Sequence, residues 1–126
     1  MGQIMRAKCT ACTFEKDLFV GGGMRDCNLD VILSPLPENV REIVEKAVRG
    51  GAGRAVIERP LCVCGSCGTI CAPTAVTFTS PSFSRTFYSV CDGCGASGYI
   101  QIGEDETAAC PACGTALSIE PVGHWD

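Results

Sequence analysis

Short apolar segments separated by turn residues follow one another along most of the chain, and they predict a mainly β protein. Residues 75–79 and 85–90 alternate between apolar and polar side chains, which is the period of a strand, and Ser80-Pro81-Ser82 separates them. We expect further strands at residues 3–8, 13–20, 54–63, 99–102, 107–109 and 116–120. Gly21-Gly22-Gly23 predicts a turn, and His124-Trp125 is expected to end a loose tail.

One segment has the period of a helix instead. Five of its apolar residues recur at the spacing i, i+3, i+4, i+7, i+8, which places them on one face: Val40, Ile43, Val44, Ala47 and Val48. Pro37 suits the first position of a helix, and Gly50-Gly51 ends it. We therefore predict an amphipathic helix at about residues 37–49 whose apolar face packs on a sheet. A face that docks a partner helix is the alternative.

The cysteine content changes this picture, because 11 of the 126 residues are cysteines. A chain of this length forms one domain or two very small ones, and such small modules commonly need metals or disulfides to fold. Three observations favour an intracellular metal protein over a secreted disulfide framework. Eight cysteines form Cys-x-x-Cys pairs, the total of eleven cysteines is odd, and residues 1–8 contain no apolar core of signal-peptide length. We therefore expect a cytoplasmic protein, and because no apolar run approaches about 18 residues, no membrane span.

The four Cys-x-x-Cys pairs are the candidate metal ligands. We call them the first (Cys9 and Cys12), second (Cys64 and Cys67), third (Cys91 and Cys94) and fourth (Cys110 and Cys113) knuckle. Two cysteines at this spacing can place both sulfurs on one side of a tight turn, and two facing knuckles make the tetrahedral four-sulfur cage that zinc accepts. The sequence thus predicts two Zn²⁺ ions. Iron in one or both cages stays open, because sequence does not separate the two metals in such a site.

Two pairings of the knuckles are compatible with the sequence. Fifteen residues separate Cys94 from Cys110, which is a spacing typical of a four-cysteine zinc ribbon. On loop-closure grounds we expect sequential pairing, in which the first knuckle faces the second and the third faces the fourth. The chain would then form two ribbon units, residues 1–80 with the helix inserted and residues 81–126. In the alternative the second and third knuckles, 23 residues apart, share a metal, and the first faces the fourth.

These knuckles resemble those of zinc ribbons and rubredoxins, and Cys110-Pro-Ala-Cys113-Gly114 has the form that rubredoxins share. The resemblance implies a fold and a metal geometry, but no biological role. The first half is also similar to small uncharacterised bacterial zinc-ribbon proteins, in which a cysteine pair precedes a Gly-x-Gly-Met or similar stretch, an amphipathic helix and further Cys-x-x-Cys-Gly elements. The match here covers Gly21 to Met24, the helix and the first, second and fourth knuckles. The third knuckle and three further cysteines depart from that pattern.

Those three cysteines, Cys27, Cys62 and Cys71, are expected to be small buried apolar residues. The clustering of Cys62 and Cys71 around the second knuckle leaves an iron–sulfur cluster, a disulfide or an alternative ligand open. His124, the single histidine, is expected to be solvated rather than to bind metal.

Charge is distributed unevenly along the chain. Residues 1–60 carry nine basic and eight acidic side chains, whereas residues 61–126 carry one basic side chain, Arg85, and six acidic ones. The second half is therefore a poor surface for a phosphate backbone. The basic residues of the first half are interleaved with acids, and we see no platform on which bases would stack.

Function is less well specified than the scaffold. We predict a structural zinc protein that binds another protein, with four aromatic residues as exposed candidates: Phe83, Phe87, Tyr88 and Trp125. Rubredoxin-like electron transfer or thiol redox chemistry is the first alternative, and a nucleic-acid-binding ribbon is the second. The sequence offers no Ser/His/Asp or Cys/His catalytic set, and a closed four-sulfur site has no free coordination position, so an enzyme is not indicated. No oligomeric state is predicted.

Overall fold

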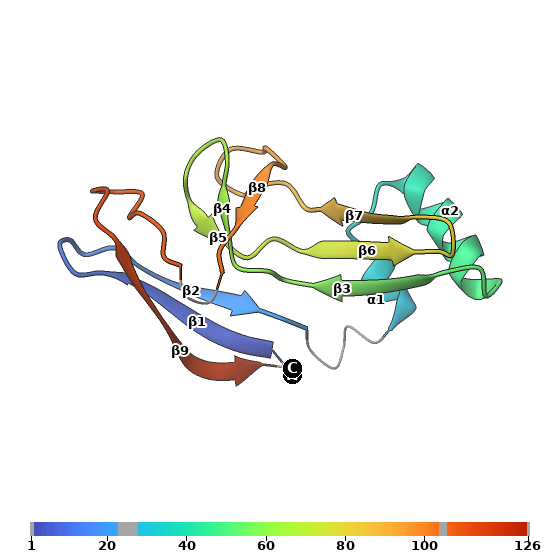
Figure 1. Ribbon diagram of the computed structural model, residues 1–126, viewed down its shortest axis with the longest axis horizontal. Coiled ribbons are helices and arrows are strands. Elements are labelled where there is room, and N and C mark those ends of the chain that lie inside the picture. Colours follow the sequence, from blue (N-terminus) through green and yellow to red (C-terminus); the bar gives the residue numbers. More distant parts are fainter. Residues whose placement is uncertain (1, 23–27, 104–105, 126) are drawn as a thin grey trace.

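The computed structural model describes residues 2–22, 28–103 and 106–125, which form three three-stranded antiparallel sheets and two helices (Figure 1). Along the long axis these sheets follow one another in the order β2-β1-β9, β5-β4-β8 and β3-β6-β7, with both helices beside the last (Figure 1). The strands are β1 (Gly2–Cys9), β2 (Glu15–Val20), β3 (Arg54–Glu58), β4 (Cys62–Cys64), β5 (Ile70–Cys71), β6 (Ala75–Thr79), β7 (Ser84–Tyr88), β8 (Tyr99–Gln101) and β9 (Leu117–Trp125). The mainly β class predicted from the sequence is confirmed.

The first sheet joins the two ends of the chain. β1 lies at its centre, and β9 pairs with it from Gly2↔Trp125 to Cys9↔Leu117, with an irregularity between Ile4 and Met5. The expectation of a loose tail at His124-Trp125 is therefore wrong, because these residues belong to a nine-residue strand. Its apolar–polar pattern was obscured by Pro121 and Gly123, which have low strand propensity.

Trp125 fixes the end of this sheet. Its indole Nε1 donates to the carbonyl oxygens of Gln3 and Val20, each at 3.1 Å. The ring meets Phe19 edge to face with 6.1 Å between centroids, and the Arg59 guanidinium lies 4.8 Å from the Trp125 ring centroid. The indole also lies over Gly2, where a Cβ atom would come within 3 Å of the ring, so only glycine fits below it.

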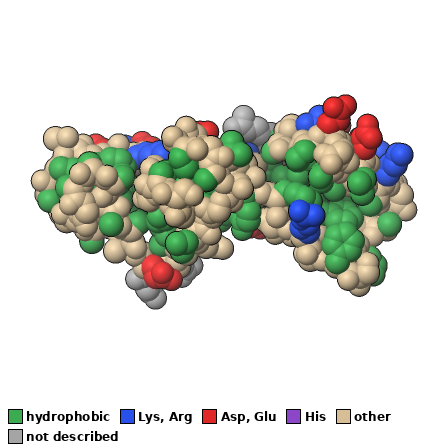
Figure 2. All heavy atoms as spheres, turned by 90° about the horizontal axis from the view of Figure 1, so that it is seen from above, with side chains coloured by type: hydrophobic (Ala, Val, Ile, Leu, Met, Phe, Trp, Pro, Cys, Tyr) green, Lys and Arg blue, Asp and Glu red, His purple; other side chains and the backbone are tan. Residues whose placement is uncertain are grey.

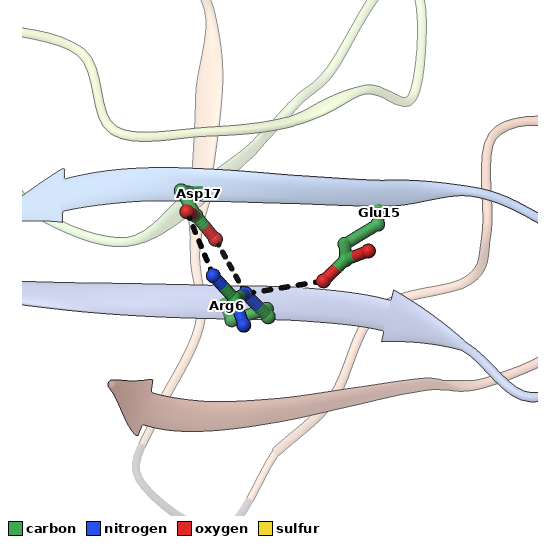
Figure 3. A network of polar contacts seen from close by, with 3 residues as sticks. All are labelled: Arg6, Glu15 and Asp17. Carbon is green, nitrogen blue, oxygen red and sulfur yellow. Dashed lines mark hydrogen bonds and ion pairs between the residues drawn. The ribbon is translucent and has the colours of Figure 1, made fainter.

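An exposed ion pair links β1 to β2, the third strand of this sheet (Figure 3). Arg6 on β1 lies opposite Asp17 on β2, and the two side chains form a two-pronged contact, Nε to Oδ1 at 2.8 Å and Nη2 to Oδ2 at 3.2 Å. Glu15 Oε1 lies 3.1 Å from the same Nε. The hydrogen bond from Arg6 holds the pKa of the Asp17 carboxyl below its usual range.

The predicted helix is confirmed as α2 (Glu38–Arg49), which packs with α1 (Leu29–Leu33) on β3-β6-β7. Pro37 is its N-cap rather than its first helical residue, because the extended ψ of 149° lies outside the helical range. Val44 enters a core built from both helices and the sheet: Ile32, Leu33, Leu36, Ile57, Val76 and Phe78. α1 was not predicted, since five residues are too few to show helical periodicity.

A second core lies under the first sheet and includes two of the knuckle cysteines. Its buried members are Ala7, Cys9, Leu18, Ile70, Ala108, Cys110 and Leu117. Among the described residues each core thus has seven buried members, which makes two small apolar interiors.

Strand pairing crosses the boundary expected at residue 80. β9 pairs with β1, β8 with β4, and β7 with β6. The division into units 1–80 and 81–126 stays a prediction, since strand pairing does not measure which segments fold independently. In the described part of the chain, neither helix has the length and apolar character that a membrane crossing requires.

Candidate metal centres

The eight knuckle cysteines gather into two groups of four. The first cage consists of the first and fourth knuckles (Cys9, Cys12, Cys110 and Cys113), and the second cage of the second and third (Cys64, Cys67, Cys91 and Cys94). Within each cage all four Sγ atoms lie within 4.8 Å of one another. Sequential pairing of the knuckles is therefore wrong, and the nested alternative is the arrangement that the structure adopts.

Strand pairing explains the nested arrangement. The β1–β9 ladder places Cys9 opposite Leu117, just beyond the fourth knuckle, and the β4–β8 ladder places Cys64 opposite Tyr99, just beyond the third. Doubling the length of a closed loop costs only about 0.6 kcal/mol. The longer loop of the first cage is therefore a small penalty beside the pairing of an eight-residue β1 with β9.

The sulfur positions fit a metal ion with tetrahedral coordination. In each cage the first cysteine of one knuckle lies against the second cysteine of the other. The Sγ–Sγ distances are 3.4 Å for Cys9–Cys113, 3.6 Å for Cys12–Cys110, 3.6 Å for Cys64–Cys94 and 3.7 Å for Cys67–Cys91. A Zn–S distance of about 2.3 Å gives a tetrahedron with edges of about 3.8 Å, whereas a disulfide needs about 2.05 Å. The cages thus have the dimensions of four-thiolate metal sites.

All four knuckles share one backbone turn. The N–H of the first cysteine donates to the carbonyl oxygen five residues later, in the pairs Cys9–Phe14, Cys64–Thr69, Cys91–Ala96 and Cys110–Thr115. After the second cysteine, Gly68, Gly95 and Gly114 have φ between 74° and 80°, a left-handed conformation that favours glycine. In the first knuckle Thr13 stands at that position, and no non-glycine residue in the described ranges has positive φ.

One thiol in each cage is stabilised as a thiolate by a threonine. The Cys67 sulfur and the Thr69 hydroxyl lie 3.3 Å apart. When the hydroxyl donates to the thiolate, it lowers the pKa of Cys67 to about 6, and Thr115 does the same for Cys113. Sequence reasoning missed these threonines, although the repeated Cys-x-x-Cys-Gly-Thr in the second and fourth knuckles distinguishes them from the other two.

The opposite knuckle of each cage carries the thiol that stays protonated without a metal. A backbone hydrogen bond from Phe14 lowers the pKa of Cys12, but the hydrogen bond with Cys9, burial and the other two cage thiols raise it to about 12. The pKa of Cys94 is raised to about 12 by the same kinds of contact, with Ala96 as the backbone donor that lowers it and the other cage thiols and burial raising it. Four thiolates repel one another unless a cation lies among them. The arrangement therefore requires positive charge at the centre for all four sulfurs to ionise.

Burial follows the same order in every knuckle. The first cysteine is buried, whereas the second is exposed or, for Cys12, half-buried. Backbone N–H groups of Ala11 and Ala112 point at the buried sulfurs of Cys9 and Cys110, each at 3.4 Å. A metal bound by these four thiolates would lie near the surface, with the first cysteine of each knuckle on its buried side. Four thiolate ligands would complete a tetrahedral coordination and leave no position for a substrate.

Two of the remaining cysteines, Cys62 and Cys71, lie outside the cages. Cys62 and Cys71 are both free thiols and face each other across the β4–β5 ladder. Burial raises the pKa of Cys62, and it raises that of Cys71 to about 11. Cys62 is buried as expected and Cys71 is half-buried. Cys27 lies outside the described residues, and His124 is exposed and belongs to neither cage.

Comparison of the chain with protein-family models, with curated proteins and with solved structures gave no match. The two clusters of paired cysteines fit metal sites of the zinc-ribbon kind, and the case for metal binding rests on their geometry alone.

Proposed function

We propose that this chain is a structural zinc protein that binds two Zn²⁺ ions, one in each four-cysteine cage, and that it serves as a module for contact with another protein. The Sγ–Sγ distances of 3.4–3.7 Å between the two knuckles of each cage carry this proposal. They give two separate groups of four thiols the spacing of a tetrahedral ZnS₄ site.

A structural role agrees with where the cages lie. The first cage ties the start of the chain to its last strand, and the second joins β4 to the segment that enters β8. Each ion would fix two knuckles that the small apolar cores hold only in part. For small metal-dependent folds the free energy of zinc binding is, in effect, free energy of folding.

Contact with a protein is supported by exposed apolar side chains. Phe83 is 56% exposed and Tyr88 is 41% exposed, and Val90 and Ile100 are also exposed. The other two aromatic candidates are less available, since Phe87 packs against the core of the third sheet and Trp125 against Gly2 and Phe19. Nucleic acid is not the partner that we propose, because residues 61–126 carry one basic side chain.

Native mass spectrometry with elemental analysis tests the metal part. We expect two zinc ions per chain, a colourless protein, and loss of sheet structure by circular dichroism after treatment with a strong chelator. A red protein that bleaches on reduction would assign the cages to iron and favour electron transfer instead. A compact, metal-free chain under anaerobic conditions would refute the proposal.

Photo-crosslinking tests the protein-contact part. A photoreactive amino acid at position 83, in an extract of the cells that make this protein, should crosslink to a defined partner in the zinc-loaded state. The same group at position 43 is the control, because Ile43 is also exposed but lies on α2. Equal, unspecific crosslinking from both positions would remove the interaction role and leave the metal assignment intact.

A further inference from the structure

The outer edge of β7 is an open strand edge. β7 is the last strand in the order β3-β6-β7, and within the described residues it pairs with β6 alone. Four of its five residues are exposed. Such an edge presents backbone donors and acceptors to any extended chain that lies beside it.

Hydrogen bonds at both ends of the β6–β7 ladder show which groups point outward. Ser80 N–H donates to the Phe83 carbonyl at 2.8 Å, and Ser89 N–H donates to the Thr74 carbonyl at 2.9 Å. Because antiparallel hydrogen bonds alternate along the ladder, odd-numbered residues of β7 bond toward β6. Ser84, Thr86 and Tyr88 therefore direct their N–H and C=O groups away from the sheet.

A groove of about 310 Å³ runs along this edge. Residues 85–88 form one wall, and Pro35, Pro37 and Ser97 complete its lining. Seen from above, hydrophobic side chains gather on the half of the molecule that carries these elements, with a basic side chain among them (Figure 2). The groove thus combines a lining of apolar and polar side chains with strand backbone that has no partner among the described residues.

Arg85 gives the groove its charge. It is the single basic residue in residues 61–126, and its guanidinium lies 4.7 Å from the Phe87 ring centroid. Both side chains lie on the helix-covered face of the sheet, since their register partners Phe78 and Val76 belong to that core. Within the described residues Arg85 forms no salt bridge, so an acidic group from outside would complement it.

Two of the other sheet edges, those of β2 and β3, are protected by charge against an added strand. β2 carries three charged residues in succession, Glu15, Lys16 and Asp17, and β3 carries charges at both ends. Charged side chains on an edge discourage pairing with another chain. β7 has one charge in five residues, and its sequence Ser-Arg-Thr-Phe-Tyr is rich in residues that favour strands.

We propose that the edge of β7 binds an extended segment of a partner protein as an added fourth strand of this sheet, with an acidic residue of that segment beside Arg85. The inference rests on the proposed role in protein contact and names the partner's chemistry. Main-chain hydrogen bonds to Ser84, Thr86 and Tyr88 would supply affinity, and the groove and Arg85 would supply specificity.

Selection from a library of random linear peptides against the zinc-loaded full chain tests this. We expect extended, strand-favouring peptides with one acidic position. Thr86→Pro should weaken their binding by about tenfold or more, because it removes an outward N–H that β6 does not use. Thr86→Val keeps that N–H and is the matched control. Arg85→Glu should replace the acidic position by a basic one in a new selection.

Metal content and circular dichroism of each variant show whether it folds. Should Thr86→Pro fail to fold, peptides N-methylated at every second residue test the same hydrogen bonds on the unchanged protein. Methylation of the residues whose N–H groups bond to β7 should abolish binding, and methylation of the residues between them should not. Peptides that bind Thr86→Pro as tightly as Thr86→Val, or the absence of any enriched peptide, would overturn the inference. Crosslinking from position 83 tests the proposed protein contact independently of the β7 edge. A dimer in sedimentation experiments that Thr86→Pro dissolves would also overturn it, by assigning the edge to a second copy.

Discussion

The Sγ atom of Cys9 lies 3.4 Å from that of Cys113, although the two residues are 104 positions apart in the sequence. The two cysteines come from the first and fourth knuckles, which stand at the same end of the β1–β9 ladder. A metal ion between them would therefore close nearly the whole chain into one loop. The first cage is in this respect a long-range crosslink rather than a local turn.

Serine substitutions distinguish the nested cages from sequential ones. Cys9→Ser and Cys113→Ser should each lower the metal content from two ions to one, and the double variant should also retain one, because both residues serve the same cage. Cys9→Ser combined with Cys67→Ser should lose both ions. Native mass spectrometry measures the count, and Cys62→Ser, outside both cages, is the control that keeps two. Two ions lost from the Cys9/Cys113 double variant would contradict the nested arrangement.

The threonine donors should set the pH at which metal is released. The lowered pKa of Cys67 means that the thiolate contributes stability above the pKa of the unfolded thiol, and that this contribution is lost as pH falls through about 6. In Thr69→Val the folded pKa rises toward its ordinary value. Zinc release on acidification, followed with a colorimetric chelator, should then begin at higher pH, with affinity at neutral pH weaker by about tenfold.

Thr115→Val should act in the same way on the first cage, since Thr115 has the same relation to Cys113. Thr77→Val is the control, because its hydroxyl contacts Thr86 on the third sheet and no cysteine. An unchanged release profile in both cage variants would show that the threonines do not support the thiolates.

Trp125 and Gly2 should behave as one unit. Trp125→Ala removes the edge-to-face contact with Phe19 and the hydrogen bonds to Gln3 and Val20, and we expect a loss of about 1–3 kcal/mol in the free energy of unfolding. Gly2→Ala should cost a similar amount, because its methyl group would occupy the place of the indole. Urea unfolding of the zinc-loaded protein measures both. In the double variant the two losses should not add, since removal of the indole leaves room for the methyl group.

Cys71 should react slowly despite lying at the wall of a cavity. A pKa of about 11 leaves roughly one thiol in a thousand ionised at pH 8, so alkylation by iodoacetamide should be on the order of a hundred times slower than for an ordinary cysteine. Peptide mapping by mass spectrometry identifies the modified residue. Small-molecule thiol under the same conditions provides the reference rate, and rapid modification of Cys71 in folded protein would show that its environment does not suppress ionisation.

Local features of this fold were readable from the sequence. The helix at about 37–49, the β class and the eight clustered cysteines depend on periodicity and on the short turn geometry of Cys-x-x-Cys, which neighbouring residues determine. The five-residue α1 and the last part of β9 were not readable, because the first is shorter than two helical turns and the second contains Pro121 and Gly123.

The partner of each knuckle could not be deduced from spacing. Loop closure favours short connections only weakly, whereas the β1–β9 ladder, formed between residues more than 100 positions apart, decides the result. The Cys-Gly-Thr repeated in the second and fourth knuckles does not decide between the two pairings. Each cage contains one knuckle with this threonine and one without it, a balance that sequential pairing would also have satisfied.

The nested order of the cages also determines when each can be completed as the polypeptide leaves the ribosome. The second cage has all its sulfurs once Cys94 emerges, whereas Cys9 and Cys12, which are synthesised before any of them, must wait for Cys113. Throughout that interval the nascent chain carries two early thiols with no permanent metal partner, exposed to oxidants and to foreign ions. A product terminated before the fourth knuckle would have the second cage complete. Its β1–β2 hairpin would lack the cysteines that complete the first cage.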